Sequence, residues 1–507
     1  MTQAKGAIRK SSWAPVIDFD GIDGADVLLS PLYSAVLNRL RTDPVAQEPD
    51  TTRFQQLRAT GYRLKTIWQE KRAARQSSPP SPADVVCWTR DLTHTANLLP
   101  VAAALAEQQI SCRLMACQPR TFQALHLRNS DALYSLGAWP TVVEKGRREG
   151  VSRAGQLARM GPCELPPFPG RVEVNLEKVV FDTMVRMLPL VSEAIANTYA
   201  ALDVLRARVL VVGNDLTLEG RAGCLVSAAR GVPSAVFMHG SITGDPLHTQ
   251  HCADRVLVYG AGNRQELMHQ GLSDERIIVC GAPHLDRLER QTGQIHPLLQ
   301  ARLGLRDTAP WILVVTSGPG HRISHRHHQQ VIRNLAQLGK TFPDMPVVVK
   351  LHRKDHVEYY EQTLHGEIPP NLRIIANDAR GFPADIFDWF QGCRIVLTGA
   401  STASIEAMLM NVPVITMDFC DEIQDVDFID SGATAHVCTS EALEQAVRGI
   451  LVGTPEIDAI RSRASTYLNS AFFALDGGSA ERGAKALRVL MGERTSAVEA
   501  NTSANHQ

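Results

Sequence analysis

Short runs of apolar residues alternate with helix-like stretches along most of this 507-residue chain. One series of such runs occupies 84–88, 111–117, 208–213, 234–239, 255–260 and 276–281, and a second occupies 311–318, 345–352, 371–376, 393–399 and 412–419. Fully apolar strands separated by helices are typical of parallel sheets that are covered on both faces. The sequence therefore predicts an α/β protein with two doubly wound, parallel-sheet domains that face a cleft.

Changes in composition place the domain boundaries. Residues 53–76 have the pattern of a charged helix, and the Pro/Ser-rich stretch 77–83 breaks it, which indicates a helical N-terminal extension that ends in a linker. The expected units are the extension over 1–83, a first domain over 84–290, a connector over 291–309, a second domain over 310–475, a closing helix over 476–492 and a disordered tail over 493–507.

Composition excludes several classes of protein. The 52 basic and 53 acidic residues give a net charge of −1, whereas nucleic-acid binding usually needs a basic excess that displaces counterions from phosphates. No run of about 18 uncharged apolar residues occurs, which argues against a membrane-spanning helix. The ten cysteines include no CxxC pair, and the start of the sequence has no apolar leader. These features favour a reduced, cytoplasmic protein, with contact at the inner face of a membrane left open.

Ligands of parallel sheets bind at the carboxyl ends of the strands, where loops and helix N-termini meet. Four strand ends carry polar groups directly after an apolar run: 211–220, 236–241, 348–355 and 396–409. In the last of these, Gly399, Ser401 and Thr402 lead into a helix, so they either cap that helix or hold a nucleotide diphosphate. Glu406, about one turn further on, is placed to accept hydrogen bonds from ribose hydroxyls.

The second series also offers cationic groups. Lys350 and His352 alternate with apolar residues at a strand end, where both would face phosphate oxygens. The charges over 353–355 resemble a solvated edge. The glycine-rich loop TSGPGHR (316–322) lets the backbone approach a phosphate closely. Its candidate donor-binding residues are Ser317, Gly318 and Arg322.

A histidine-rich segment, HRISHRHH (321–328), raises the alternative of a metal site. Its four histidines are interleaved with arginines on a predicted helix, and the positive charge of those arginines would repel a divalent ion. We therefore predict that the protein uses no metal and no other cofactor.

Acid–base candidates lie in the first series. His239, followed by Gly240, is a candidate general base because an imidazole titrates near neutral pH, although a structural, capping histidine explains the same pattern. Asp215, at the neighbouring strand end, is the second candidate. His94, at the mouth of the first βα unit, and Gly240 are candidates for the acceptor side of the cleft.

Together these motifs resemble those of the GT-B glycosyltransferases, whose two Rossmann-like domains face each other across a nucleotide-sugar cleft. The nearer likeness is to the branch that joins non-hydrolysing UDP-N-acetylglucosamine 2-epimerases with bacterial capsule polysaccharide polymerases and CDP-glycerol glycerophosphotransferases. The likeness covers about residues 84–420. Four segments carry it: VLVVGNDLTLEGRAGCLVSAARGVPSAVFMHGS (209–241), VCGAPHLDRL (279–288), VVKLHRKD (348–355) and TGASTASIEAMLMNVPVI (398–415).

The resemblance implies roles for single residues. His239 matches the histidine of the transferases' HG motif, which is a proposed catalytic base. His352 matches the histidine that contacts the donor phosphate, and Lys350 lies beside it. The matches in the last segment are the pyrophosphate-binding hydroxyl pair Ser401 and Thr402 and the acid Glu406.

The sequence also departs from these families. Arg353 replaces the usual proline after His352, and residues 400–402 (AST) replace the aspartate–tyrosine–serine–serine run of the glycerophosphate transferases, which favours a sugar donor. Residues 214–215 (ND) keep a carboxylate that the epimerases have. Residues 239–240 (HG), however, replace the histidine-x-glutamate-alanine-glycine segment of the epimerases, which argues against epimerase chemistry.

The resemblance thus implies an inverting, metal-independent glycosyltransferase. It would move a sugar from a nucleotide-activated donor, held by the second domain, to a bacterial surface glycan or lipid-linked glycan, held by the first. A sugar-nucleotide 2-epimerase or hydrolase of the same fold is the alternative. A non-catalytic scaffold of a glycan-assembly complex, docking through residues 1–75, is the alternative of another class. Expected partners are the donor, the acceptor and a membrane surface or assembly complex, and not nucleic acid.

Overall fold

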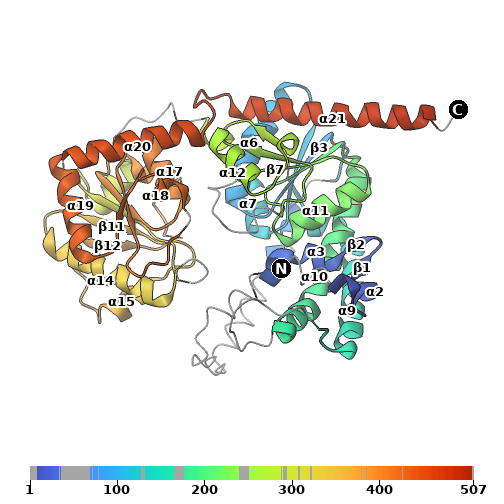
Figure 1. Ribbon diagram of the computed structural model, residues 1–507, viewed down its shortest axis with the longest axis horizontal. Helices are drawn as coiled ribbons and strands as arrows, with labels where there is room; N and C mark the ends of the chain where they lie inside the picture. Colours follow the sequence, from blue (N-terminus) through green and yellow to red (C-terminus); the bar gives the residue numbers. More distant parts are fainter. Residues whose placement is uncertain are drawn as a thin grey trace.

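Two α/β domains lie beside each other in the computed structural model of the chain (Figure 1). The structure describes residues 8–33, 35, 69–70, 72–77, 79–126, 132–164, 176–238, 250–286, 288, 294–306, 309–319, 323–377, 379–383, 385–424 and 426–504. Each domain contains one parallel sheet, so the predicted fold class is confirmed. None of the helices in these described stretches is long and apolar enough to cross a membrane.

The first domain is built on a seven-stranded sheet in the order β5-β4-β3-β6-β7-β8-β9, and every pair in it is parallel. Its strands are β3 (Val85–Thr89), β4 (Cys112–Ala116), β5 (Ala132–Tyr134), β6 (Val209–Val212), β7 (Ser234–Phe237), β8 (Arg255–Val258) and β9 (Ile277–Val279). The strand order reverses between β3 and β6, and ligands of open α/β sheets bind at the carboxyl edge of such a switch point.

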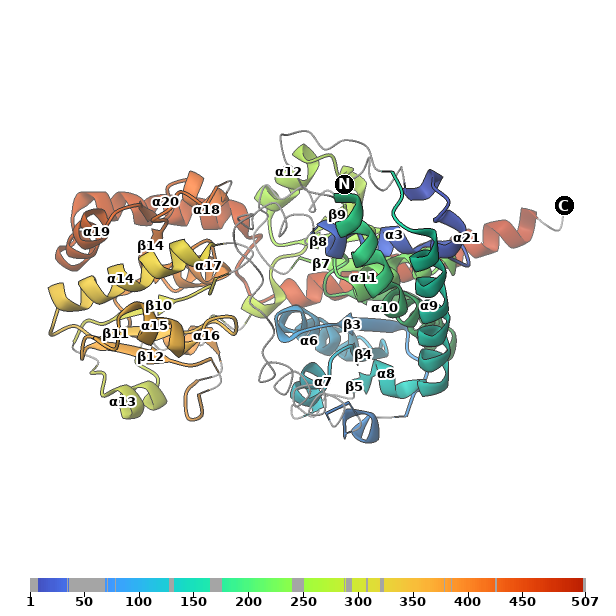
Figure 2. The same cartoon turned by 90° about the horizontal axis from the view of Figure 1, so that it is seen from below.

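Helices cover both faces of this sheet (Figure 2). Successive residues of β3 alternate between the faces, as the two-residue period of a strand requires. Val85 and Cys87 pack with α6 and α21, whereas Val86 and Trp88 pack on the side of α10 and α11. The helices of this domain are α6 (Leu92–Glu107), α7 (Pro119–His126), α8 (Ser135–Ala138), α9 (Pro140–Met160), α10 (Leu176–Leu205), α11 (Leu218–Ala229), α12 (Ala261–His269) and α21 (Ser479–Ala504), with 3-10 turns η2 (Asp274–Arg276) and η3 (Pro283–Leu285).

The second domain is built on a six-stranded parallel sheet in the order β12-β11-β10-β13-β14-β15. Its strands are β10 (Ile312–Val315), β11 (Val347–Lys350), β12 (Leu372–Ile375), β13 (Ile395–Thr398), β14 (Val414–Met417) and β15 (Ala435–Val437). Its helices are α13 (Pro297–Leu303), α14 (His325–Thr341), α15 (Val357–Thr363), α16 (Ile386–Phe390), α17 (Thr402–Leu409), α18 (Asp427–Asp430), α19 (Ser440–Val452) and α20 (Pro455–Ala471).

The first part of the expected N-terminal extension packs on the first domain. It contains α2 (Ala14–Ile17), an antiparallel pair of β1 (Asp18–Phe19) with β2 (Ile22–Asp23), and α3 (Gly24–Val27). The Asp26 carboxylate accepts a hydrogen bond of 2.7 Å from the Arg221 guanidinium of α11, and both side chains are largely buried. Apolar residues among the polar ones, such as Trp13, join the core of the first domain. Of the predicted charged helix over 53–76, residues 69–70 and 72–76 are described, and they are helical.

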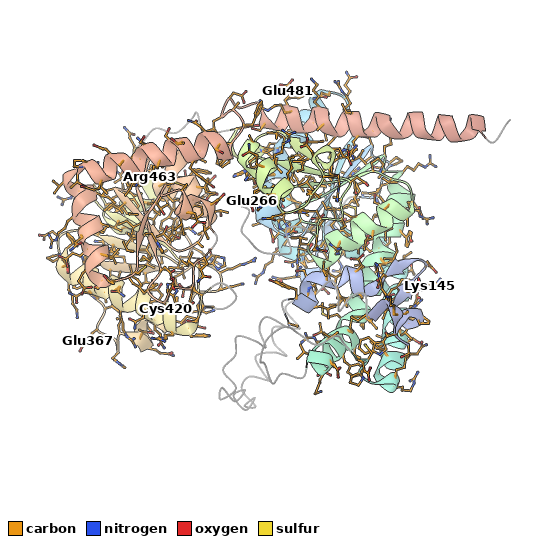
Figure 3. The ribbon with its side chains drawn as sticks, in the orientation of Figure 1. Lys145, Glu266, Glu367, Cys420, Arg463 and Glu481 are labelled. Carbon is orange, nitrogen blue, oxygen red and sulfur yellow. The ribbon has the colours of Figure 1, made fainter. Side chains whose placement is uncertain are left out.

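After the second domain the chain returns to the first. Figure 3 shows Arg463 on α20 beside the second domain and Glu481 near the start of α21 beside the first. The end of α20 lies against Gly260, where an added Cβ would be 2.3 Å from the Ala471 carbonyl oxygen. The helix α21 then packs along α6, and it continues to Ala504, where a tail had been expected to follow residue 492.

The motif VCGAPHLDRL (279–288) holds the start of α21 against the first domain. The Asp286 carboxylate accepts hydrogen bonds from the first free amides of α21, those of Ser479 (3.1 Å) and Ala480 (2.7 Å), and so caps that helix. Gly281 has a φ of 91°, and a Cβ there would be 2.4 Å from the Ser479 hydroxyl oxygen. The glycine and the aspartate of this motif therefore have a structural purpose.

Candidate active site

Three neighbouring strands of the second domain end in one row. Val315, at the end of β10, is paired with Lys350 of β11 on one side and with Thr398 of β13 on the other. Neighbouring strands lie about 4.8 Å apart. The loops that follow these strands therefore leave the same edge of the sheet, and they carry most of the donor-binding residues predicted from the sequence.

Glycines allow these loops to touch. Gly318 has a φ of 69°, and a Cβ at this position would lie 2.8 Å from the carbonyl carbon and oxygen of Lys354. A larger residue is therefore excluded by both backbone conformation and space. A Cβ at Gly399 would be in ordinary contact, 4.0 Å from the Ser317 hydroxyl oxygen. The loop after β10 thus lies between the loops after β11 and β13.

His352 presents a hydrogen-bond donor at this edge. The Lys354 amide donates to His352 Nδ1 at 3.2 Å, so Nδ1 carries no proton and Nε2 is the N–H of the neutral ring. Burial, followed by the charges of Arg353 and Lys354, lowers the pKa of His352, which keeps the ring neutral at pH 7. The half-buried imidazole is therefore prepared to donate to a phosphate oxygen.

A buried carboxylate holds the turn that carries His352. Asp355 accepts a hydrogen bond from the Tyr360 hydroxyl at 3.1 Å and lies 3.0 Å from His328 Nε2 of α14. Only 4% of Asp355 is exposed. The expectation of a solvated edge over 353–355 therefore fits Arg353 and Lys354, which are exposed, but is wrong for Asp355.

The histidine-rich segment helps to position the turn that carries His352. His328 approaches Asp355, whereas His327 Nδ1 lies 3.5 Å from Glu422 and 3.7 Å from Asp418. The two buried imidazoles thus approach different carboxylates and do not converge. Among the described residues, one group of metal-ligand atoms lies within 4.8 Å of one another, and it consists of Asp215, Cys224 and Cys252 in the first domain.

Lys350 and Glu406 face each other at the strand-end edge. The Lys350 Nζ lies 5.6 Å from the centre of the Trp389 ring, close enough for a cation–π contact. Burial lowers the pKa of Lys350, and Glu406 partly restores it. Burial and Asp385 raise the pKa of Glu406 to about 8, with Lys350 opposing them. Glu406 therefore keeps its proton at pH 7 in the free protein, next to a cation that can neutralise a phosphate.

The raised pKa of Glu406 predicts a pH-dependent stability. The unfolded glutamate loses its proton near pH 4.5 and the folded one near pH 8. Since the folded state binds more protons in this window, the free energy of unfolding falls as the pH rises through it. The Glu406→Gln variant cannot ionise, so between pH 5 and pH 8 it should gain roughly 1–3 kcal/mol relative to the native chain, an amount reduced by partial exposure to water. Urea unfolding of both proteins at the two pH values measures this, and an unchanged difference contradicts it.

The start of α17 has the capping geometry that the sequence left open. Ser401 is the N-cap residue, and its hydroxyl oxygen accepts a hydrogen bond of 3.3 Å from the Ala403 amide. Thr402 follows as the exposed first residue of the helix. The remaining free amides of the first turn and the helix dipole favour an anion here. Capping and phosphate binding are therefore compatible at Ser401.

The first domain brings a second polar group to the same region. Asn97 of α6 donates from Nδ2 to the Met238 carbonyl (2.8 Å) and approaches the Tyr259 hydroxyl (2.9 Å). Its Oδ1 lies 2.8 Å from His284 Nδ1. Because Asn97 Oδ1 can only accept, His284 carries its proton on Nδ1 and has a lone pair on Nε2. Burial lowers the pKa of His284 to about 4, so this ring is neutral at pH 7.

Charges of the second domain shift the pKa values of residues in the first. The polar group with Lys350 and Glu406 and the polar group around Asn97 therefore face each other. Asp385 of the second domain raises the pKa of His284 against burial, and Glu406 adds to the rise of the Tyr259 pKa that burial causes. Burial lowers the pKa of His94, and Arg353 of the second domain lowers it further. An apolar cluster continues this contact, with members from both domains: Tyr259, Leu285, Phe387, Trp389 and Phe472.

Sequence reasoning missed several of these residues. Asn97, Tyr259, His284 and Asp385 were not singled out, although His284 lies inside the motif VCGAPHLDRL. The available signal was that Tyr259 directly follows β8, but the direction of its side chain depends on contacts between segments that are far apart in the sequence. His94 lies at the predicted mouth of the first βα unit, 6% exposed and near Arg353.

Three predicted site residues, His239, Gly240 and Arg322, lie outside the described residues. Met238, directly before the first of them, is described and bonds to Asn97. The roles of His239 and Arg322 therefore stay predictions from the sequence.

Asp215 is a buried structural carboxylate in this structure. It has no exposed surface, and His251 Nδ1 donates to it at 2.7 Å. The amides of Cys252 (2.8 Å) and Ala253 (3.1 Å) donate to its other oxygen. Burial would raise the pKa of Asp215, but these donors lower it to about 2. A carboxylate whose oxygens are all engaged has no room for an acceptor hydroxyl, so we do not retain it as the base.

We expect the Asp215→Asn variant to lose about 3–5 kcal/mol of unfolding free energy, because one half of a buried pair would remain. The matched control is Asp274→Asn, since Asp274 pairs with Arg264 at 2.6 Å on the surface, where such a pair contributes little to the free energy of unfolding. Urea unfolding measures both. A stable Asp215→Asn protein with no turnover would instead restore the catalytic role.

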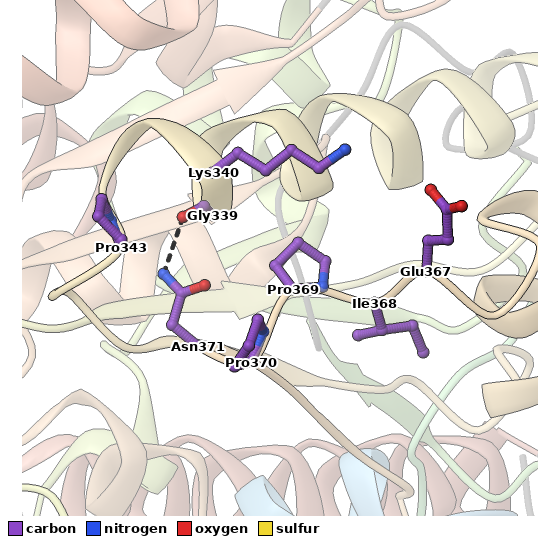
Figure 4. A pocket seen from close by; sticks show the side chains of 8 residues that line it. All are labelled: Gly339, Lys340, Pro343, Glu367, Ile368, Pro369, Pro370 and Asn371. Atoms are coloured by element: carbon purple, nitrogen blue, oxygen red, sulfur yellow. Dashed lines mark hydrogen bonds between the residues drawn. The ribbon is translucent and has the colours of Figure 1, made fainter.

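A separate hollow of about 370 Å³ lies at the opposite edge of the second sheet (Figure 4). Asn371 lines it, directly before β12, and donates from Nδ2 to the carbonyls of Gly339 (3.0 Å), Phe342 (2.8 Å) and Met345 (2.9 Å). This asparagine therefore satisfies the C-terminal end of α14. The hollow is remote from the strand ends that carry the candidate site.

Two parallel α/β domains with polar strand ends that face each other define the GT-B fold. The family model of the UDP-N-acetylglucosamine 2-epimerases matches residues 247–472, and the predicted branch of this fold is thereby confirmed. The UDP-GlcNAc 2-epimerase of Neisseria meningitidis, solved with UDP-GlcNAc, is similar in structure, with a TM-score of 0.55, 14% identity and coverage of 80% of this chain and 99% of that chain. MnaA of S. aureus, solved with UDP, has a TM-score of 0.55, 12% identity and coverage of 81% and 97%. No curated relative matches the sequence.

Proposed function

We propose that this chain transfers a sugar from a nucleotide-activated donor to a glycan acceptor. The observation that carries the proposal is the group at the strand ends of the second domain, where Lys350, the His352 Nε2–H and Glu406 lie beside the free amides of α17. A cation, a neutral donor and helix amides suit a diphosphate, and a carboxyl group suits ribose hydroxyls. Both similar structures hold UDP or a UDP-sugar, so UDP is the nucleotide to test first.

In this proposal His239 removes the proton from the acceptor hydroxyl. The acceptor oxygen then attacks the anomeric carbon with inversion, and the bond between that carbon and the diphosphate oxygen breaks. Lys350 and His352 stabilise the charge that develops on the leaving diphosphate, which is the main electrostatic task of such a site. Closure of the two domains around the substrates excludes water and limits hydrolysis of the donor.

A 2-epimerase or hydrolase is the second candidate, supported by the family model over 247–472. The polar groups that the two domains turn toward each other also include those that an acceptor-independent reaction needs. His284 is neutral with a free Nε2, and Glu406 keeps its proton at pH 7, so one side can accept a proton while the other donates one.

Incubation with radiolabelled UDP-sugars, UDP-N-acetylglucosamine first, separates these candidates. Turnover that requires a bacterial glycan extract supports transfer. Release of free sugar, or conversion to an isomeric UDP-sugar, without that extract supports the second candidate and contradicts transfer. Absence of any thermal shift with UDP would contradict both and leave the scaffold, since a ligand that binds only the native form raises its melting temperature.

A further inference from the structure

A cavity of about 200 Å³ lies inside the first domain and was not singled out in the sequence. It is located at the carboxyl ends of β3, β4 and β5, beneath α10. Trp88 forms one wall with residues that directly follow these strands. The other residues used below are Arg90, Cys117, Ser135, Leu190, Asn197 and Glu219.

Two buried polar groups of this cavity are poorly satisfied by the protein. The Asn197 side chain is 2% exposed, and its Oδ1 has no hydrogen-bond partner among the described residues. Ser135 is fully buried, and among the described residues its hydroxyl has the weakly polar Cys117 thiol as its one partner. A buried polar atom without a partner costs about 1–3 kcal/mol. A ligand that pairs with Asn197 and Ser135 would recover that free energy.

The charges of the cavity cancel. At its rim Arg90 Nη1 lies 3.4 Å from Glu219 Oε2, and both side chains are partly exposed. Deeper in the wall, Glu193 is paired with Arg147 at 2.6 Å. The cavity therefore offers several hydrogen-bond donors and acceptors but no net charge, which excludes a preference for phosphates or carboxylates.

Size and shape narrow the class of ligand further. At about 30 Å³ per water molecule, 200 Å³ corresponds to about seven waters, which is too small for a nucleotide and suits a single ring. The Trp88 ring and aliphatic side chains such as Leu190 supply apolar surface, and a few polar groups fix orientation, as in most small-molecule sites. A neutral ring with several hydroxyls and apolar C–H faces matches both features.

We propose that this cavity binds one neutral sugar ring. Arg90 connects it to the side of the first domain that faces the second, because Arg90 lies near His94, which in turn lies near Arg353 of the second domain. The identification of that ring as the terminal sugar of the acceptor rests on the proposed function. The binding of a sugar ring does not.

The probes are methyl β-glycosides of glucose, galactose and N-acetylglucosamine, followed by saturation-transfer NMR and calorimetry on the full chain without nucleotide. Asn197→Leu removes the unpaired acceptor at similar size. Leu190→Trp blocks the rim, and since Leu190 is 46% exposed this change spares the core. Val204→Trp is the matched control, because Val204 is 43% exposed on the same helix and does not line the cavity.

We expect at least one glycoside to bind the native chain and Val204→Trp equally, and to bind Leu190→Trp and Asn197→Leu about tenfold more weakly or not at all. Binding by none of the glycosides, or equal binding by Leu190→Trp and the native chain, overturns the proposal. A parallel UDP titration separates the two proposals. UDP binding without glycoside binding overturns the sugar cavity alone, and glycoside binding without UDP binding supports the cavity while it contradicts the proposed function.

Discussion

Replacement of His239 by alanine is expected to lower the turnover of the donor by about 10²–10⁴-fold, the usual contribution of a positioned general base. The expectation rests on the sequence, where His239 and Gly240 directly follow a buried strand. It gains support from the structure because Asp215, the other candidate base, is fully engaged by His251 and backbone amides. Initial rates with a radiolabelled UDP-sugar and a glycan acceptor measure the effect.

UDP affinity should change little in the His239→Ala protein, because the proposed donor ligands belong to the second domain. The matched control is His269→Ala, at the exposed end of α12, which should leave both turnover and affinity unchanged. Normal turnover in the His239→Ala protein would exclude this histidine as the base. His284, with its free Nε2, would then be the next group to test.

Replacement of Lys350 by methionine is expected to weaken UDP binding by about 10–100-fold. Methionine is of similar length, but it lacks the charge that faces the phosphates and contacts the Trp389 ring. A hydrogen bond to a charged group contributes about 1.5–3 kcal/mol, and each 1.4 kcal/mol corresponds to a factor of ten. Calorimetric titration with UDP measures the loss.

Lys340→Met is the control for this change. Lys340 is an exposed lysine of the same domain, and it lines the hollow at the opposite edge of the sheet. Its replacement should leave UDP affinity unchanged. Equal affinity of the Lys350→Met and native proteins would mean that the nucleotide does not bind at the ends of β10, β11 and β13.

The sheets of both domains could be predicted from the sequence because each buried strand is a short apolar run. The edge that carries Lys350, His352 and Ser401 followed from the rule that ligands bind at carboxyl strand ends. Local patterns were sufficient for these features, since neighbouring residues determine strand length, helix capping and loop position. The candidate donor residues of the described loops accordingly lie together as expected.

Features that depend on distant segments could not be predicted in this way. Asn97 looks like an ordinary polar residue of a helix, yet it joins His284, Tyr259 and the end of β7. Asp355 follows two exposed charges in sequence, but its carboxylate is buried beside His328 of α14. The apolar residues of the segment with α2, β1, β2 and α3 fall in short, irregular runs, so their pattern gave no sign that they join the core of the first domain.

The return of the chain has a consequence for how the protein is synthesised. Leu487, Leu490 and Met491 of α21 belong to the same buried cluster as β3 and α6, about four hundred residues earlier in the sequence. The first domain therefore cannot complete its core until α21 has been synthesised, and α21 follows the second sheet and its helices in the chain. The domain that is translated first thus depends on a segment that is translated after the second domain, and a nascent chain stalled before residue 479 is expected to expose the α6 side of its first sheet to chaperones.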